Sequence, residues 1–220
     1  MPNPNQHYID LKAICDQYGA SLLVVSKTRS EKEIKTIYDS GQRIFGENRA
    51  HELIIKASLL PTDIEWHLVG HLQTNKVKPI IPFVSCIQSL DSWKLWQKLN
   101  EEAKEAGKQI NCLLQIKVAV EETKYGWEMN ELVQLLKSGA HKDLSSISMT
   151  GVMGMASLTA DKDQVRHEMK QLKTNFDFLK TNFFNDHTQF NTLSMGMSGD
   201  YSIALEEGST MIRIGSLIFE

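Results

Sequence analysis

Cysteine is scarce in this sequence, and the few that occur are not arranged for disulfide or metal chemistry. Cys15, Cys86 and Cys112 are the only three, and no CxxC pair is present. A sparse, odd number of cysteines argues against a disulfide framework and against a thiolate zinc site. No apolar run approaches the roughly 20 residues that span a bilayer. The polar residues 1–5 also lack a signal-peptide pattern. We therefore expect a protein of the reducing cytoplasm.

Positive charge is not in excess either. Lys and Arg together number 24 against 27 Asp and Glu, for a formal net charge of −3. No basic stripe is visible, so we expect no nucleic-acid partner and no membrane partner. The sequence also contains no GxGxxG motif, no P-loop and no evident nucleophile–base triad.

The bulk composition is that of an ordinary globular protein. Apolar residues make up 41% of the chain and charged residues 23%, close to the averages for such proteins. A length of 220 residues is ordinary for one α/β barrel. No linker and no low-complexity segment divides the chain. We predict a single domain over residues 1–220.

Short β-rich segments recur along the chain, and each is followed by a helical pattern. Near-continuous apolar runs suit strands that are buried on both faces of a parallel sheet. Strand–helix alternation indicates βαβ units, and eight of them predict a closed (β/α)8, or TIM-type, barrel. Residues 1–19 form an extra N-terminal helix. The alternative is an open doubly wound sheet. The predicted strands are Ala20–Lys27, Arg43–Asn48, Ile64–Gly70, Phe83–Leu90, Ile110–Ala119, Ile147–Ala156, Thr192–Ser198 and Met211–Phe219.

Helix boundary signals stand between these strands. Ser30 and Glu33 form a capping box, and Gly41 suits the residue just past the end of the same helix. Further helices are predicted over residues 91–107, 128–139 and 161–184, each with a polar residue at its start.

Lys27 follows the apolar run Leu22–Val25 at the end of the first predicted strand. In a barrel of this type, function lies where strands end and βα loops begin. A lysine at the edge of the barrel interior is buried enough to favour its neutral amine, the form that attacks an aldehyde. The alternative is a lysine whose ammonium group simply extends into solvent.

Polar residues also end the second and third predicted strands. Asn48 can donate and accept hydrogen bonds and so suits a ring hydroxyl or phenolate, although it could equally be the N-cap of the next helix. His67 and His71 are four residues apart, but they straddle a strand end and Gly70. No acidic residue stands at ligand spacing, so we predict no metal site.

Small residues dominate the ends of the last two predicted strands, which read SMGMSGD over residues 194–200 and MIRIGS over residues 211–216. Barrels often bind a phosphate with these two loops. Small residues let backbone N–H groups approach the anion, and a helix beginning near Gly199 would present its N-terminus to it.

Arg213 alternates with two isoleucines and should therefore face the barrel interior. A buried guanidinium needs an acceptor, either a ligand or a structural carboxylate. A strand-one lysine, a phosphate cradle and an interior arginine together describe a site for an aldehyde phosphate. Met155, Met195 and Met197 fit the core and the pocket lining.

Several blocks of the sequence are recognisable together, from about Leu22 to Phe219. They are VVSKT at residues 24–28, FGEN at 45–48, WHLVGHLQTNK at 66–76 and SMGMSGD at 194–200, followed by Ala204, GST at 208–210 and RIG at 213–215. These blocks resemble the pyridoxal phosphate homeostasis protein family, whose fold is also that of the N-terminal domain of alanine racemase.

The resemblance implies a site for pyridoxal 5′-phosphate (PLP), with Lys27 carrying the cofactor as a Schiff base. It implies that the phosphate is held by Ser198, Gly215 and Ser216. It further implies that Arg213 approaches the pyridine nitrogen and that Asn48 lines the ring. Met197 completes the predicted cofactor-binding set.

Two residues depart from the family pattern. Lys117 stands at the end of the fifth predicted strand, where asparagine is most common, and this affects the shape of the substrate side. Ser216 stands where threonine is common, which is a milder change.

Two functions of different classes fit such a site. The first is a carrier that binds, buffers and releases PLP in vitamin B6 homeostasis, for PLP-requiring apo-enzymes, without substantial catalysis. The second is a PLP-dependent amino-acid racemase. A third reading is a cofactor-free barrel that acts on sugar phosphates through Lys27.

The carrier is the prediction, for two reasons. Racemases of this fold add a β-rich C-terminal domain that supplies a second base, whereas here nothing follows the last predicted strand, and Tyr125 lies in a loop of unknown reach. An arginine beside the pyridine nitrogen also weakens the ring as an electron sink. With no covering domain, we expect a monomer.

Overall fold

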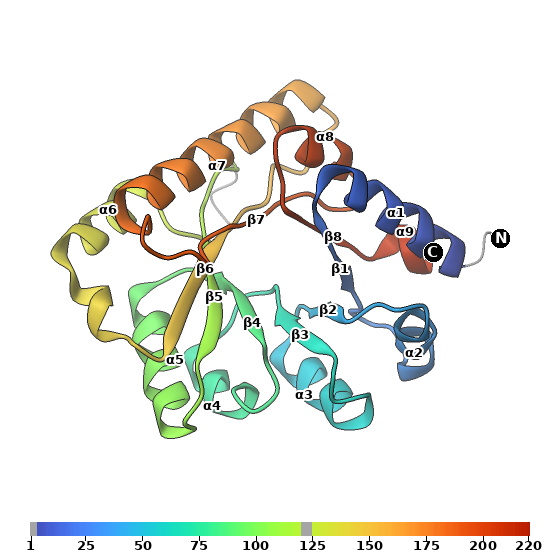
Figure 1. Ribbon diagram of the computed structural model, residues 1–220, viewed down its shortest axis with the longest axis horizontal. Coiled ribbons are helices and arrows are strands. Elements are labelled where there is room, and N and C mark those ends of the chain that lie inside the picture. Colours follow the sequence, from blue (N-terminus) through green and yellow to red (C-terminus); the bar gives the residue numbers. More distant parts are fainter. Residues whose placement is uncertain (1–3, 120–124) are drawn as a thin grey trace.

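The computed structural model describes residues 4–119 and 125–220. Within these ranges, eight parallel strands close into a barrel in chain order (Figure 1). β1 pairs with β2 on one side and with β8 on the other, where Leu22 lies opposite Ile212. The predicted (β/α)8 barrel is confirmed, and the open sheet is wrong. The strands are β1 Ser21–Val25, β2 Ile44–Glu47, β3 Glu65–Leu68, β4 Cys86–Leu90, β5 Ile110–Gln115, β6 Ile147–Met153, β7 Thr192–Ser194 and β8 Met211–Ile214.

Helices surround the barrel on its outer side (Figure 1). The predicted extra N-terminal helix is α1, which buries Leu11 and Cys15 and contacts β1 and α9. The helices in the described ranges are α1 Pro4–Tyr18, α2 Glu31–Asp39, α3 Ala50–Leu59, α4 Val77–Ile80, α5 Trp93–Glu105, α6 Met129–Ser138, α7 Lys162–Phe183, α8 Tyr201–Glu206 and α9 Ser216–Phe219, with 3-10 turns at Thr74–Lys76 and Ala140–Asp143.

The predicted helix boundary signals are present as hydrogen bonds and turns. Ser30 caps α2: its Oγ accepts from the Glu33 N–H (3.4 Å), and Glu33 Oε2 accepts from the Ser30 N–H (2.8 Å), the reciprocal pattern of a capping box. Gly139 ends α6 with φ +76°, a left-handed conformation that glycine adopts without strain. The side chain of Asp161 accepts two backbone N–H groups at the start of α7.

All strands except the fourth, which ends at Leu90 as predicted, end earlier than predicted. The eighth was expected to reach Phe219, but β8 ends at Ile214 and the last apolar residues form α9. The backbone leaves the strand at Gly215 (φ −126°, ψ −72°) and Ile218 is buried. A short apolar run fits a buried helical turn as well as a strand, which explains the error. The residues predicted at strand ends therefore lie mostly in the loops beyond them.

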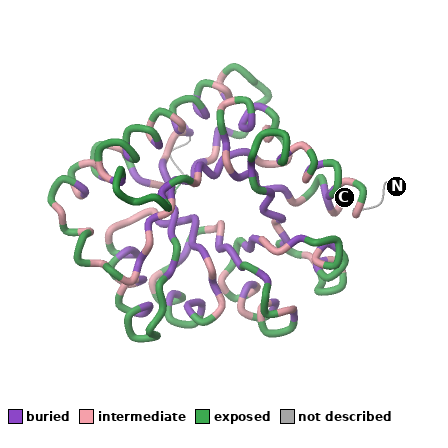
Figure 2. Tube along the Cα trace, viewed as in Figure 1, coloured by how far each residue is buried: buried purple, intermediate pink, exposed green. Residues whose placement is uncertain are grey.

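The hydrophobic core lies between the barrel and its helices. Figure 2 shows strands that are buried over most of their length and helices whose outer faces are exposed. Every residue of β4 and β8 is buried. Over the described ranges, no helix is both long enough and apolar enough to cross a membrane.

Candidate functional site

A cavity of about 580 Å³ opens at the carboxyl ends of the strands. Function concentrates at this end of (β/α)8 barrels. All seven residues predicted to bind the cofactor line this one cavity: Lys27, Asn48, Met197, Ser198, Arg213, Gly215 and Ser216. Of the described residues, its walls also contain Val25, Thr28, Arg29, Val69, Gly70, His71, Gln115, Tyr125, Met155, Leu158, Gly199 and Glu220.

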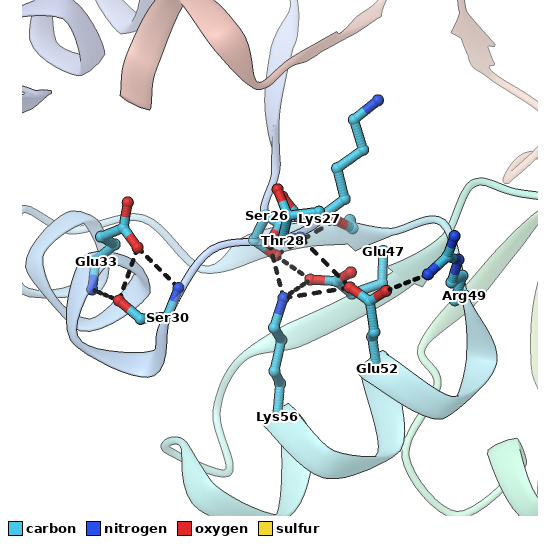
Figure 3. A network of polar contacts seen from close by, with 10 residues as sticks. Ser26, Lys27, Thr28, Ser30, Glu33, Glu47, Arg49, Glu52 and Lys56 are labelled. Atoms are coloured by element: carbon cyan, nitrogen blue, oxygen red, sulfur yellow. Dashed lines mark hydrogen bonds and ion pairs between the residues drawn. The ribbon is translucent and has the colours of Figure 1, made fainter. Parts of the chain in front are cut away.

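Lys27 lies on a turn two residues beyond the end of β1. Ser26 before it is fully buried, but Lys27 itself is exposed. The expected burial of Lys27 at the edge of the barrel interior is therefore wrong, because the chain turns outward after Ser26. Figure 3 shows its side chain extended away from the polar groups beneath the turn. Among the described residues, no hydrogen bond or ion pair engages its amine. It remains available to a ligand in the cavity.

Asn48 follows β2 and is exposed at the cavity wall. The alternative role as N-cap is wrong, because Arg49 holds that position and no side chain caps α3. The carbonyl of Asn48 packs closely on Gly70, where an added Cβ would lie 2.2 Å from the Asn48 oxygen. Gly70 therefore lets the ends of β2 and β3 approach each other at the cavity.

Arg213 is buried and faces the cavity from β8. Its Nη1 donates to Ser194 Oγ (2.7 Å) and its Nη2 donates to the carbonyl of Gly154 (3.0 Å). Both acceptors are neutral, and no carboxylate in the described part of the chain forms an ion pair with Arg213. The alternative of a structural carboxylate partner is therefore wrong. Burial lowers the pKa of the guanidinium to about 10, and the charge of Asp200 acts in the opposite direction. Arg213 remains a cation at neutral pH.

Three further interior residues continue the contacts of Arg213. Ser194 Oγ donates to Gln88 Oε1 (2.7 Å), and Gln88 Nε2 lies 2.9 Å from His67 Nδ1. An amide nitrogen can only donate, so Nδ1 accepts. Burial lowers the pKa of His67 to about 4, which keeps the ring neutral. We call His67, Gln88, Ser194 and Arg213 the arginine chain.

Small residues form the wall beside Arg213. An added Cβ at Gly215 would lie 2.9 Å from the carbonyl oxygen of Val25, while one at Gly199 would meet open space. The Met197 N–H donates to Asp200 Oδ1 (2.6 Å). The predicted helix near Gly199 begins only at Tyr201 and has six residues. A second short helix, α9, begins at Ser216 on the same wall.

Comparisons with known proteins agree with this geometry. The family model "Alanine racemase, N-terminal domain" matches residues 6–220. The "Pyridoxal phosphate homeostasis protein" of Pasteurella multocida is 35% identical over 91% of this chain and 86% of its own length. The protein of the same name from Aquifex aeolicus is 34% identical over 95% and 92%.

This chain belongs to the pyridoxal phosphate homeostasis protein family. Its fold is that of the alanine racemase N-terminal domain. PipY of Synechococcus elongatus, a solved structure at 32% identity, superposes with a TM-score of 0.89 without PLP and 0.83 with PLP bound. The former match covers 97% of this chain and 99% of PipY.

The cavity wall in this homeostasis-family barrel also contains residues whose place could not be predicted from the sequence. Tyr125 lines the cavity and its ring stacks on His71, with 3.9 Å between centroids and an interplanar angle of 12°. His71 Nδ1 in turn lies 2.8 Å from Asp91 Oδ2. The reach of Tyr125 could not be judged before the fold was known. The sequence signal was only that these residues follow β3, β4 and β5.

Lys117, the main departure from the family pattern, is held outside the large cavity. It lies two residues past the end of β5, and its Nζ is 3.2 Å from Glu128 Oε1. It is not among the described residues of the cavity wall. The charge of Lys117 is thus paired with that of Glu128 outside the cavity, whereas Gln115 at the end of β5 lines the cavity.

Proposed function

We propose that this chain is a single domain over residues 1–220 that binds PLP as a Schiff base on Lys27 and carries and buffers it without substantial catalysis. One observation carries the proposal. A single cavity is lined both by an exposed lysine amine without a partner among the described residues and by a buried guanidinium that has only neutral acceptors. The names of the related homeostasis proteins and the PLP-bound PipY structure support the identity of the ligand.

The residues present fit this cofactor. A cavity of about 580 Å³ lies in the size range of sites for small molecules and cofactors. The uncompensated charge of Arg213 and the close approach allowed by Gly215 suit an anionic, planar ligand. When bound, PLP would supply an aldehyde carbon and a phosphate. The Lys27 amine would add to that carbon, and loss of one water would leave a carbon–nitrogen double bond.

The other members of the proposed binding set have distinct roles. Ser198, Gly215 and Ser216 would hold the phosphate, Asn48 would face the ring, and Met197 would supply apolar contact. Arg213 would face the pyridine nitrogen. A guanidinium only donates hydrogen bonds and so cannot accept one from a protonated pyridine nitrogen. Arg213 therefore disfavours protonation of the nitrogen and weakens the ring as an electron sink. This choice favours storage over carbanion chemistry.

We further propose that the protein acts in the cytoplasm as a monomer and hands PLP to apo-enzymes that require it. All three cysteines are free and buried, which suits a reducing compartment. Sedimentation equilibrium would test the monomer. Transfer to an apo-enzyme in the presence of an aldehyde trap would test a directed hand-over, because released PLP is captured by the trap.

The central experiment is borohydride reduction of the PLP-treated protein, followed by peptide mapping. A reduced, stable label is expected on Lys27. A label on Lys76, on Lys117 or on Lys124, which lies outside the described residues, would refute the assignment. Untreated protein provides the control for non-specific modification.

Racemization is the second candidate, and the position of Tyr125 is the observation that favours it. Tyr125 and His71 line the same cavity as Lys27, and racemization would need a second base within that cavity. Exchange of the α-proton of alanine, serine and glutamate in deuterated water decides between the two. Exchange no faster than with free PLP supports the carrier. Exchange on the order of 1 s⁻¹ or faster would establish the racemase instead.

A further inference from the structure

The turn that carries Lys27 is fastened on both sides. Before it, the Ser26 carbonyl accepts from Lys56 Nζ (2.7 Å) and the Ser26 hydroxyl donates to Glu47 Oε1 (2.6 Å). After it, the Thr28 N–H donates to Glu52 Oε2 (3.4 Å). Figure 3 shows these contacts converging below the turn while the Lys27 side chain points away from them. The backbone of Lys27 is therefore held, whereas its amine is not.

The anchoring groups come from the neighbouring βα unit. Glu47 is the last residue of β2, and Glu52 and Lys56 stand one turn apart on α3. Lys56 Nζ lies 2.7 Å from Glu47 Oε1 and 3.9 Å from Glu52 Oε2. We call these three residues, together with Ser26 and Thr28, the lysine network. It ties the end of β1 to β2 and α3 through side chains, in addition to the backbone bond from the Ser26 N–H to the Gly46 carbonyl (2.9 Å).

Thr28 shows why the turn needs such anchors. Its φ is +62°, the only positive φ of a non-glycine residue in the described ranges. A β-branched residue rarely adopts this conformation, and it persists only where surrounding contacts impose it. The Thr28 hydroxyl donates to the Lys27 carbonyl (2.6 Å). The Arg29 N–H donates to the Ser26 carbonyl (3.0 Å), and this backbone bond closes the turn. The bond from Thr28 N–H to Glu52 then fixes its direction.

Stability alone does not account for the charged pair at the centre of the network. Glu47 is fully buried and Lys56 nearly so. One carboxylate oxygen, Oε2, has no hydrogen-bond partner among the described residues. Burial raises the pKa of the Glu47 carboxyl, against the opposing effect of Lys56 and Ser26. Apolar residues of similar volume would often stabilise a fold equally well. An apolar pair, however, would offer no donor to the Ser26 carbonyl and no acceptor to the Ser26 hydroxyl.

We propose that Glu47 and Lys56 are positioning residues, which hold the Ser26–Thr28 turn so that the Lys27 amine projects into the cavity. The proposal rests on the proposed function, in which that amine attaches PLP. Neither residue is among the described residues that line the cavity. Both act through the backbone on either side of Lys27.

The test replaces the pair as a unit, with Glu47→Leu/Lys56→Met. This double variant keeps the buried volume and is expected to fold, because an ion pair exchanged for apolar residues often leaves stability unchanged. Amide hydrogen exchange of residues 27–29, measured without PLP, should accelerate at least tenfold. Covalent attachment of PLP at Lys27, fixed by borohydride at timed intervals, should slow at least tenfold. The single variant Glu47→Gln keeps an acceptor for Ser26 and Lys56. It should attach PLP at a rate within about threefold of that of wild type.

The matched control is Lys173→Met/Asp177→Leu, which removes an exposed ion pair on α7. It should change neither exchange at residues 27–29 nor attachment. A folded Glu47→Leu/Lys56→Met protein with unaltered exchange and unaltered attachment would overturn the positioning role. Should that variant not fold, exchange at residues 27–29 and attachment of PLP are measured on Ser26→Ala and Glu52→Gln instead. Unaltered values of both would again overturn the positioning role. A wild-type chain that attaches no PLP at Lys27 would refute the proposed function instead, and the exchange data would still decide the positioning role.

Discussion

The lysine network and the arginine chain border the same cavity, but they arrange charge in opposite ways. In the lysine network, the buried charges of Glu47 and Lys56 are paired below the turn, and the functional amine of Lys27 is exposed above it. In the arginine chain, the functional cation is itself buried and all its assigned partners are neutral. The difference suits two tasks. A nucleophile must reach and release its ligand, whereas a recognition group must keep its charge uncompensated until the ligand arrives.

The two systems also respond differently to the loss of one member. Removal of Glu47 takes the nearer carboxylate away from the buried Lys56 ammonium and leaves only that of Glu52, 3.9 Å away. Removal of a neutral member of the arginine chain leaves only an unsatisfied hydrogen-bonding group, which is the smaller penalty. The following predictions use this asymmetry.

The largest effect on stability is expected from Glu47→Leu alone. Breaking a buried ion pair by removing one partner costs about 3–5 kcal/mol. Ser194→Ala, in the arginine chain, should cost about 1–3 kcal/mol. Chemical denaturation of both variants measures the difference, and Glu47→Leu/Lys56→Met serves as the internal control because it should recover most of the loss. Equal losses in free energy of unfolding in the two single variants would show that removing a charged partner costs no more than removing a neutral one.

Acid should weaken the arginine chain through His67. The folded-state pKa of His67 is about 4, against an ordinary value of 6.5, so the unfolded chain binds the proton more readily. The neutral ring contributes its full stability above pH 6.5, and this is lost as the pH falls toward 4. A difference of about 2.5 in pKa corresponds to about 3 kcal/mol.

The measurement is the free energy of unfolding of wild type and His67→Gln between pH 7 and 4. The difference between the two curves isolates His67 from the carboxylates, which titrate in both proteins. Parallel curves over this range would show that His67 is not held neutral in the folded state.

Much of the lysine network could not be predicted from the sequence, although its signal was present. Lys56 lies three residues after Leu53 on the same side of α3, and both are buried. A lysine on such a helix face usually extends to solvent. Only the closure of β1 beside β2 places Ser26 and Glu47 within its reach. The interior position of Arg213, in contrast, followed from simple alternation along a strand.

The fold and the residues that line the cavity could be predicted from the sequence more readily than the local backbone geometry. Repetition of strand–helix units predicted the barrel, and its eight strand ends necessarily meet at one mouth. The errors concern where a strand stops and how far a side chain is buried, as for Phe219 and Lys27. Both depend on backbone turns such as the one at Thr28, for which a β-branched residue gives no warning.

The next prediction concerns how the cavity binds the phosphate group of PLP. We expect PLP to bind the protein far more tightly than pyridoxal, which lacks the phosphate. Each lost charge-assisted hydrogen bond is worth about 1.5–3 kcal/mol, or roughly 10- to 150-fold in affinity. Equilibrium dialysis is done with the Lys27→Ala protein, which cannot form the Schiff base. It therefore measures only the non-covalent affinity for each compound. Similar affinities for the two compounds would show that Ser198, Gly215 and Ser216 do not bind phosphate.

The smallest effect on stability is expected from Lys27→Ala, although its chemical effect is complete. The Lys27 side chain is exposed and has no assigned partner among the described residues, so its loss should change the free energy of unfolding by less than about 0.5 kcal/mol. The backbone anchors on Ser26 and Thr28 remain in this variant. Borohydride should then fix no label at residue 27, while non-covalent PLP binding through the arginine side persists. A loss of stability comparable to that of Glu47→Leu would mean that Lys27 is part of the structural network and not a group presented by it.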